Sequence, residues 1–228
     1  MQTSNEVGTI RQLVSDVAAA ALPAELDDGL TFDLGQVSAE AIREGDEYNG
    51  VRVRLLARLA SAREPFHVDV SVGDPIWPQP AEISLPRLLE EDPIRLRGYP
   101  MEMVLAEKIV TVLQRGQAST RWRDFGDIYQ LTGRYVFVAQ EIQQALQAVA
   151  DYRRVEISGL DDALEGYAEI GQHRWARWRT KLQLADTLPA DFGDTLASLL
   201  SFANPILMGS TVGSASWNPA RRAWIDAG

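Results

Sequence analysis

Residues 103–131 read MVLAEKIVTVLQRGQASTRWRDFGDIYQL, and this stretch decides how the second half of the chain is interpreted. Apolar residues recur every three to four positions on both sides of a break at Gly116. The spacing predicts two helices, over about 101–115 and 120–132, each with one face in a core. Both helices also carry charged residues next to their apolar faces.

Lys108 lies inside the apolar stripe of the first helix, with Val104 and Val112 one turn to either side. Only two of the 22 basic residues are lysines, so arginine is the usual cation of this chain. A lysine ammonium is a compact point charge that suits phosphate oxygens at the edge of a pocket. The alternative is a surface lysine whose stem lies on apolar side chains while its ammonium reaches water.

The second helix carries paired charges. Asp124 and Asp127 are three residues apart, so they project from the same side of the helix. Arg121 and Arg123 fall in its first turn, where cations are unfavourable, and this suggests that they answer an anion from elsewhere. The alternative is an Arg123–Asp127 pair within the helix, worth about 0.2–0.5 kcal/mol.

Before residue 100 the pattern is that of strands. In GVRVRLLARL, residues 50–59, Val51, Val53 and Leu55 alternate with arginines, which predicts one apolar and one basic face. Further short segments rich in valine and phenylalanine predict strands at 29–34, 37–42, 66–74 and 81–86, after a helix at 9–22.

Asp69 stands inside the strand FHVDVSVGD, between Val68 and Val70. Because side chains alternate along a strand, Asp69 is expected on its polar face. Acidic residues are disfavoured inside strands. The carboxylate is therefore either a metal ligand or base, or the partner of Arg52 or Arg54 on the neighbouring strand.

Beyond residue 100 the spacing predicts three more helices, at 138–150, 160–185 and 192–202. The tail, residues 204–224, is predicted to be a Gly/Ser loop closed by a short helix capped at Asn218. The predicted architecture is α+β, with a sheet domain over 1–99 and a helical domain over 100–228.

Composition excludes several classes of protein. A net charge of −10 counts against a chain whose whole surface binds duplex nucleic acid. The absence of cysteine excludes disulfides, thiolate metal sites and a cysteine nucleophile. No apolar run approaches the roughly 20 residues of a membrane span, and the first residues do not form a signal peptide. A cytoplasmic location without a membrane partner is expected.

Three segments, at 27–55, 66–74 and 96–131, together resemble the AbiEii-type nucleotidyltransferase toxins, a group related to the mycobacterial MenT toxins. The resemblance covers about residues 27–180, and its most specific part is the ordered run of YP, AEK and RxRDFxDIY. It implies a DNA polymerase β-like nucleotidyltransferase fold, with a small mixed sheet followed by a helical C-terminal half that completes the active-site cleft.

The resemblance also implies Mg²⁺ as cofactor, a nucleoside triphosphate as substrate, the 3′ end of a tRNA as acceptor and a cognate antitoxin as partner. Such chemistry needs carboxylates for the metal and cations for the polyphosphate. The residues expected to carry it are Asp69 (metal and catalysis), Lys108 (catalysis and triphosphate), Asp124 and Asp127 (catalysis, in a supporting role), and Arg121 and Arg123 (nucleotide).

The sequence departs from the family in one respect. The family has an Asp-x-Asp strand after a glycine-serine turn, and no Asp-x-Asp precedes Asp69. Either the start codon lies upstream, or the chain is a truncated member. Two functions are therefore expected as alternatives, a nucleotidyltransferase toxin and an inactive remnant that binds nucleotide, RNA or protein. A kinase or hydrolase of another class is disfavoured, since the chain has no Walker loop and no GxSxG.

Overall fold

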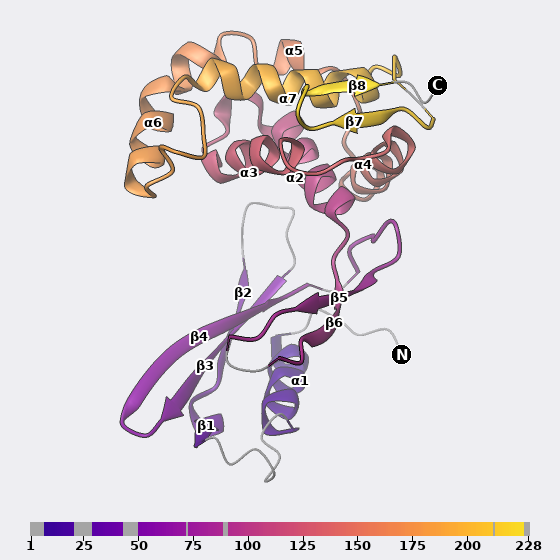
Figure 1. Cartoon of the computed structure of the whole chain (residues 1–228). Helices are drawn as coiled ribbons and strands as arrows, with labels where there is room; N and C mark the ends of the chain where they lie inside the picture. The colour runs from indigo at the N-terminus through magenta and orange to yellow at the C-terminus, as the bar shows by residue number, and fades with distance from the viewer. Residues whose placement is uncertain are drawn as a thin grey trace. The chain divides into compact units, whose positions relative to one another are not determined.

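The computed structural model describes residues 7–20, 29–42, 50–71, 73–88, 91–211 and 213–225. The chain divides into two compact units, Met1–Asp74 and Pro75–Gly228, which we call the sheet unit and the helical unit (Figure 1). Both helices and strands are present, so the predicted α+β class is confirmed. The predicted division into a sheet domain over residues 1–99 and a helical domain over residues 100–228 stays a prediction.

The sheet unit is built around the long strand β3 (Gly50–Leu59). One edge of β3 pairs with β4 (Ala62–Val70), to which a tight turn joins it. The other edge pairs with β1 (Leu30–Phe32) and β2 (Ser38–Ile42) in succession. All these pairings are antiparallel, so the expected mixed sheet is antiparallel in the part that the structure describes. A two-residue turn permits no other pairing of its two strands.

Alternation along β3 creates the core of this unit. Val51, Val53 and Leu55 are buried, as their spacing predicted. They pack with Ile10 and Ala18 of helix α1 (Val7–Ala20), which covers this face of the sheet. The arginines between them therefore lie on the opposite, polar face.

The helical unit holds six described α-helices and two hairpins. The helices are α2 (Met101–Arg115), α3 (Trp122–Thr132), α4 (Ala139–Arg153), α5 (Leu160–Ala163), α6 (Tyr167–Lys181) and α7 (Phe192–Leu207). The hairpins are β5 (Ala81–Leu85) with β6 (Ile94–Gly98), and β7 (Ser216–Asn218) with β8 (Ala223–Ile225).

Helix α7 organises the core of the helical unit, since it packs against α3, α4, α5 and α6 (Figure 1). Phe192 at its first turn lies between aromatic rings of the neighbouring helices, with its centroid 5.4 Å from those of both Phe125 and Tyr167. Gly116 ends α2 with φ 48°, and a Cβ there would lie 2.8 Å from the carbonyl oxygen of Ala163. The glycine therefore allows α5 to pack against the end of α2.

The sequence predicted α2, α3, α4 and α7 well but was wrong in three places. The predicted helix over 160–185 is two helices, because Gly166 adopts φ 70° and breaks it. Strand β6 was missed, although its arginines alternate with Ile94 and Leu96 as the arginines of β3 alternate with its valines. The tail is the β7–β8 hairpin, in which Asn218 accepts from the backbone N–H of Arg221 and shapes a turn.

Candidate functional site

Two carboxylates of α3 converge on the ammonium of Lys108. Its Nζ lies 2.8 Å from Oδ1 of Asp124 and 2.8 Å from Oδ2 of Asp127. The second oxygen of Asp124 lies 2.8 Å from Nε of Arg121. The structure thus brings together four of the predicted site residues, which we call the α2–α3 cluster.

The packing of two helices positions this cluster. Ile109 of α2 and Phe125 and Ile128 of α3 are buried in one core, which fixes the neighbouring faces of the two helices against each other. Asp124 and Asp127 are one turn apart on α3, so both reach the same lysine. The side chain of Lys108 is 18% exposed and that of Asp124 only 8%, so their charges are largely withdrawn from water.

Lys108 remains charged in this environment. Burial alone would lower the pKa of its ammonium, but the hydrogen bonds to Asp124 and Asp127 outweigh burial and raise the pKa above its ordinary value. An ammonium has three N–H donors, and these carboxylates engage two of them. The Lys108 ammonium is therefore held in a fixed position, and among the described residues its third donor has no acceptor.

The structure shows neither of the two simple alternatives, a Lys108 ammonium in water or an Arg123–Asp127 pair. The Lys108 ammonium does not extend into water, because carboxylates hold it. Asp127 pairs with Lys108 and not with Arg123, whose side chain is exposed and without an ion pair in the part of the chain that the structure describes. Arg121, predicted to answer an anion from elsewhere, is paired with Asp124 of its own helix.

Asp69 lies on the polar face of the sheet unit, as predicted. It stands opposite Arg52 of β3, and its two oxygens accept from Nε and Nη2 of that arginine, each at 2.7 Å. The hydrogen bonds from Arg52 are the main reason that the pKa of Asp69 is lowered. The pairing alternative for Asp69 is thus realised, and its role as metal ligand stays a prediction.

Among the described residues, two further arginines of β3 form ion pairs on this face. Arg54 lies 2.6 Å from Glu40, and Arg58 lies 2.8 Å from Asp33. Because these arginines alternate with the core residues of β3, each meets an acid from a neighbouring strand or from the loop beyond it. Asp69 is therefore one member of a ladder of ion pairs.

The described residues do not by themselves fit a Mg²⁺ site. Magnesium takes carboxylate oxygens in octahedral geometry. Asp69 is a single carboxylate engaged by Arg52, while Asp124 and Asp127 already hold cations. Within the described ranges, no group of three or more histidine, aspartate or glutamate residues could hold a metal ion.

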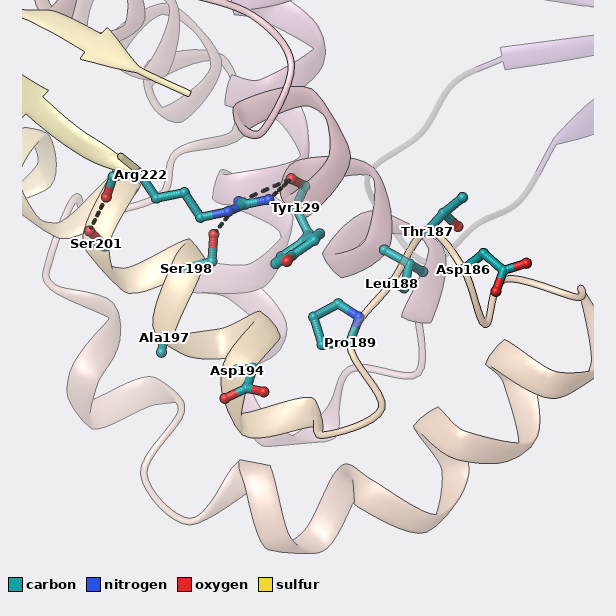
Figure 2. Close-up of a pocket in the computed structure, with 10 residues that line it drawn as sticks. All are labelled: Tyr129, Asp186, Thr187, Leu188, Pro189, Asp194, Ala197, Ser198, Ser201 and Arg222. Atoms are coloured by element: carbon teal, nitrogen blue, oxygen red, sulfur yellow. Dashed lines mark hydrogen bonds between the residues drawn. The ribbon is translucent and has the colours of Figure 1, made fainter. Parts of the chain in front are cut away.

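Sequence reasoning missed Arg222, which lines a cavity of about 620 Å³ between α3, α7 and the loop before α7. Figure 2 shows its guanidinium directed at the backbone oxygen of Tyr129, 3.2 Å away, and at the hydroxyl of Ser198, 2.6 Å away. The guanidinium carbon also lies 3.8 Å from the centroid of the Tyr129 ring. These donors are used within the chain, so Arg222 fastens the β7–β8 hairpin to α3 and α7. Nothing in the sequence distinguishes it from Arg221.

The α+β fold agrees with the comparison to known families. The model of the nucleotidyl transferase AbiEii toxins of type IV toxin–antitoxin systems matches residues 8–205. The chain belongs to this family, and it is a nucleotidyltransferase-like toxin. No significant match was found among curated proteins or solved structures. None of the described helices combines the length and the apolar character of a membrane span.

Proposed function

We propose that this chain binds the triphosphate of a nucleoside triphosphate at the α2–α3 cluster and transfers the nucleotide to the 3′ end of a tRNA. The observation that carries the proposal is the Lys108 ammonium, held between Asp124 and Asp127 with one donor left over. It offers a fixed positive charge that needs no reorganisation when a polyphosphate arrives.

The charges around the cluster favour an anion. The four residues of the α2–α3 cluster carry two positive and two negative charges, and Arg123 beside them adds one positive charge in a chain of net charge −10. Arg123 is exposed on α3, where it can meet phosphate oxygens. The two acids orient Lys108 and Arg121, and the excess positive charge comes from Arg123.

The proposed reaction is an in-line displacement at the α-phosphorus. The 3′ hydroxyl oxygen of the acceptor forms a bond to this phosphorus, while the bond to the bridging oxygen breaks and pyrophosphate leaves. The hydroxyl proton passes to a base. Positive charge next to the β- and γ-phosphates stabilises the negative charge that develops on pyrophosphate. That is the role proposed for Lys108, with Arg121 and Arg123.

Other parts of the proposal rest on the family. Nucleotidyltransferases generally use a divalent metal, and Mg²⁺ is the proposed cofactor, with Asp69 as its proposed ligand in the described chain. No step is assigned to the metal, because the described residues do not complete a site for it. A cognate antitoxin is the proposed protein partner, and the cytoplasm, where tRNA and nucleotides meet, is the proposed location.

A second function is favoured by one observation. Within the described ranges, no cluster of acids fits a metal. A chain without such a cluster would bind nucleotide, RNA or a partner and catalyse no transfer. Asp69 and the α2–α3 cluster would then serve binding and stability alone.

Label transfer separates the two functions. The purified chain is incubated with Mg²⁺, α-labelled nucleoside triphosphates and total tRNA, beside Lys108→Ala and the matched variant Arg115→Ala. Arg115 is an exposed cation on the same helix, outside the cluster. Transfer that is lost in Lys108→Ala and kept in Arg115→Ala supports the enzyme. No transfer by the wild-type chain, with nucleotide binding intact, contradicts the enzyme and supports the second function.

A further inference from the structure

A groove of about 650 Å³ opens between α3 and α6 of the helical unit. Its lining includes two tryptophans, Trp122 of α3 and Trp178 of α6, and three permanent cations, Arg174, Arg177 and Lys181. None of the described residues that line it is acidic. In a chain of net charge −10, this is a local concentration of positive charge.

The cations of the groove are not used by the fold. Arg174, Arg177 and Lys181 are exposed, and they form no ion pair or hydrogen bond with any residue in the described ranges. Arg179, in contrast, donates to the backbone oxygens of Leu188 and Ala185 and holds the chain beyond α6. Cations in a last helical turn stabilise the helix dipole. Arg174 and Arg177 precede that turn, so the dipole does not account for them.

The two tryptophans of the groove also differ from the other tryptophans of the core. Trp175, Trp217 and Trp224 each donate their indole N–H to a backbone oxygen, as buried indoles usually do. Trp122 and Trp178 have no acceptor in the described part of the chain, and their N–H groups are not fully buried. Both indole N–H groups are therefore able to donate to a ligand.

Each of these indole rings is held in place by packing against core residues. Trp122 stacks on Tyr167, with centroids 6.0 Å apart and an interplanar angle of 18°. Trp178 lies 5.2 Å from Trp175 and packs closely on α3 at Gly126, where a Cβ would come within 3.1 Å of its ring. Both rings are partly buried against the core, so the groove presents rigid aromatic surfaces.

We propose that this groove binds a single-stranded segment of nucleic acid. Its bases stack on Trp122 and Trp178, and its phosphates pair with Arg174, Arg177 and Lys181. Aromatic platforms beside cations are the means by which proteins bind single strands without reading sequence. A duplex keeps its bases inside and leaves the indoles unused, and an acidic peptide uses only the cations. The proposal rests on the proposed function and deepens it, because it supplies a site for the single-stranded acceptor end of the RNA.

Binding to the full chain is measured by fluorescence anisotropy with a labelled single-stranded RNA of mixed sequence. The double variant Arg174→Ala/Arg177→Ala is expected to raise Kd at least about tenfold. The matched double variant Arg115→Ala/Arg134→Ala removes the same charge from exposed sites outside the groove, and it is expected to change Kd less than about twofold. Each phosphate contact contributes about −0.7 to the slope of log K against log salt concentration. The slope is therefore expected to be about −2 for the wild-type chain, with three contacts, and about −0.7 for Arg174→Ala/Arg177→Ala, with one contact. An equal loss in both double variants would overturn the proposal.

A stacking variant tests the aromatic half independently. Trp178→Leu keeps an apolar side chain on Gly126 but loses the stacking face, and it is expected to weaken binding about tenfold, whereas Trp178→Phe retains most of it. Thermal unfolding verifies that each variant is folded. Single-stranded DNA in place of RNA shows whether the groove selects the sugar. Duplex RNA or polyglutamate that binds as tightly as the single strand refutes the assignment. Since the readout is binding, lost transfer with intact groove binding refutes only the proposed function.

Discussion

The Nζ of Lys108 lies 2.8 Å from Oδ1 of Asp124, across the contact between α2 and α3. The carboxylate is nearly buried and accepts a second cation, Arg121, through its other oxygen. Such a pair fixes both helices and keeps a charged ammonium away from bulk water. The functional proposal and the stability predictions both depend on this contact.

Removal of the ammonium is expected to destabilise the helical unit. Lys108→Met keeps most of the apolar stem but removes the ammonium from Asp124 and Asp127. Among the described residues, Asp124 then keeps Arg121 as its cation and Asp127 has none. An unsatisfied buried polar group costs about 1–3 kcal/mol of unfolding free energy. Urea denaturation of Lys108→Met beside Lys181→Met, an exposed lysine, measures the difference. Equal stability of the two variants would show that the cluster contributes nothing to the fold.

The same cluster predicts a dependence on alkaline pH. The folded-state pKa of Lys108 is raised above its ordinary value of 10.5. A raised pKa contributes stability that is fully present below the unfolded pKa and is lost as pH rises through the folded one. The difference in unfolding free energy between wild type and Lys108→Met should therefore be constant from neutral pH to about pH 10 and shrink above it. A difference that grows with alkaline pH would contradict the paired ammonium.

Substitution of Asp69 separates its structural role, the ion pair with Arg52, from its proposed role as a metal ligand. Its ion pair with Arg52 is about one-third exposed, so Asp69→Asn is expected to cost less than about 1 kcal/mol of stability. Glu40→Gln breaks the comparable Arg54 pair on the same face and serves as the matched control. If Asp69 is a metal ligand, Asp69→Asn loses label transfer while Glu40→Gln retains it. Equal transfer in both variants would show that Asp69 serves only its ion pair with Arg52.

Arg222 is expected to be important for stability. Its guanidinium donates to Tyr129 and Ser198 and covers the Tyr129 ring, a geometry that a lysine cannot reproduce. Arg222→Lys is expected to lower the unfolding free energy by about 1–3 kcal/mol, since buried acceptors lose their donors. Arg221→Lys, at the exposed neighbouring position, is expected to change it by less than about 0.5 kcal/mol. Comparable melting temperatures for the two variants would argue against the role given to Arg222.

Local patterns predicted the regular elements, because their causes are local. The alternation of Val51, Val53 and Leu55 with arginines specified both faces of β3, and the 3.6-residue spacing around Lys108 specified α2. The pairing of Lys108 with Asp124 and Asp127 depends on the packing of α2 against α3, which the spacing within either helix does not specify.

Features that depend on distant contacts were not predictable. Trp217 and Trp224 form a hairpin because both rings pack with Phe202, which lies outside the tail. Without that contact, the Asn-Pro dipeptide at residues 218–219 reads equally well as the start of a helix. The groove between α3 and α6 likewise forms only because these two helices lie side by side, which no pattern within α6 can show.

Equilibrium binding of nucleotides tests the central claim most directly. Titration calorimetry compares a nucleoside triphosphate with the corresponding nucleoside, in wild type, Lys108→Ala and Arg115→Ala. The account predicts that the triphosphate binds wild type and Arg115→Ala alike, binds Lys108→Ala at least about tenfold more weakly, and binds better than the nucleoside. Unchanged triphosphate affinity in folded Lys108→Ala would contradict the claim that the α2–α3 cluster receives the polyphosphate.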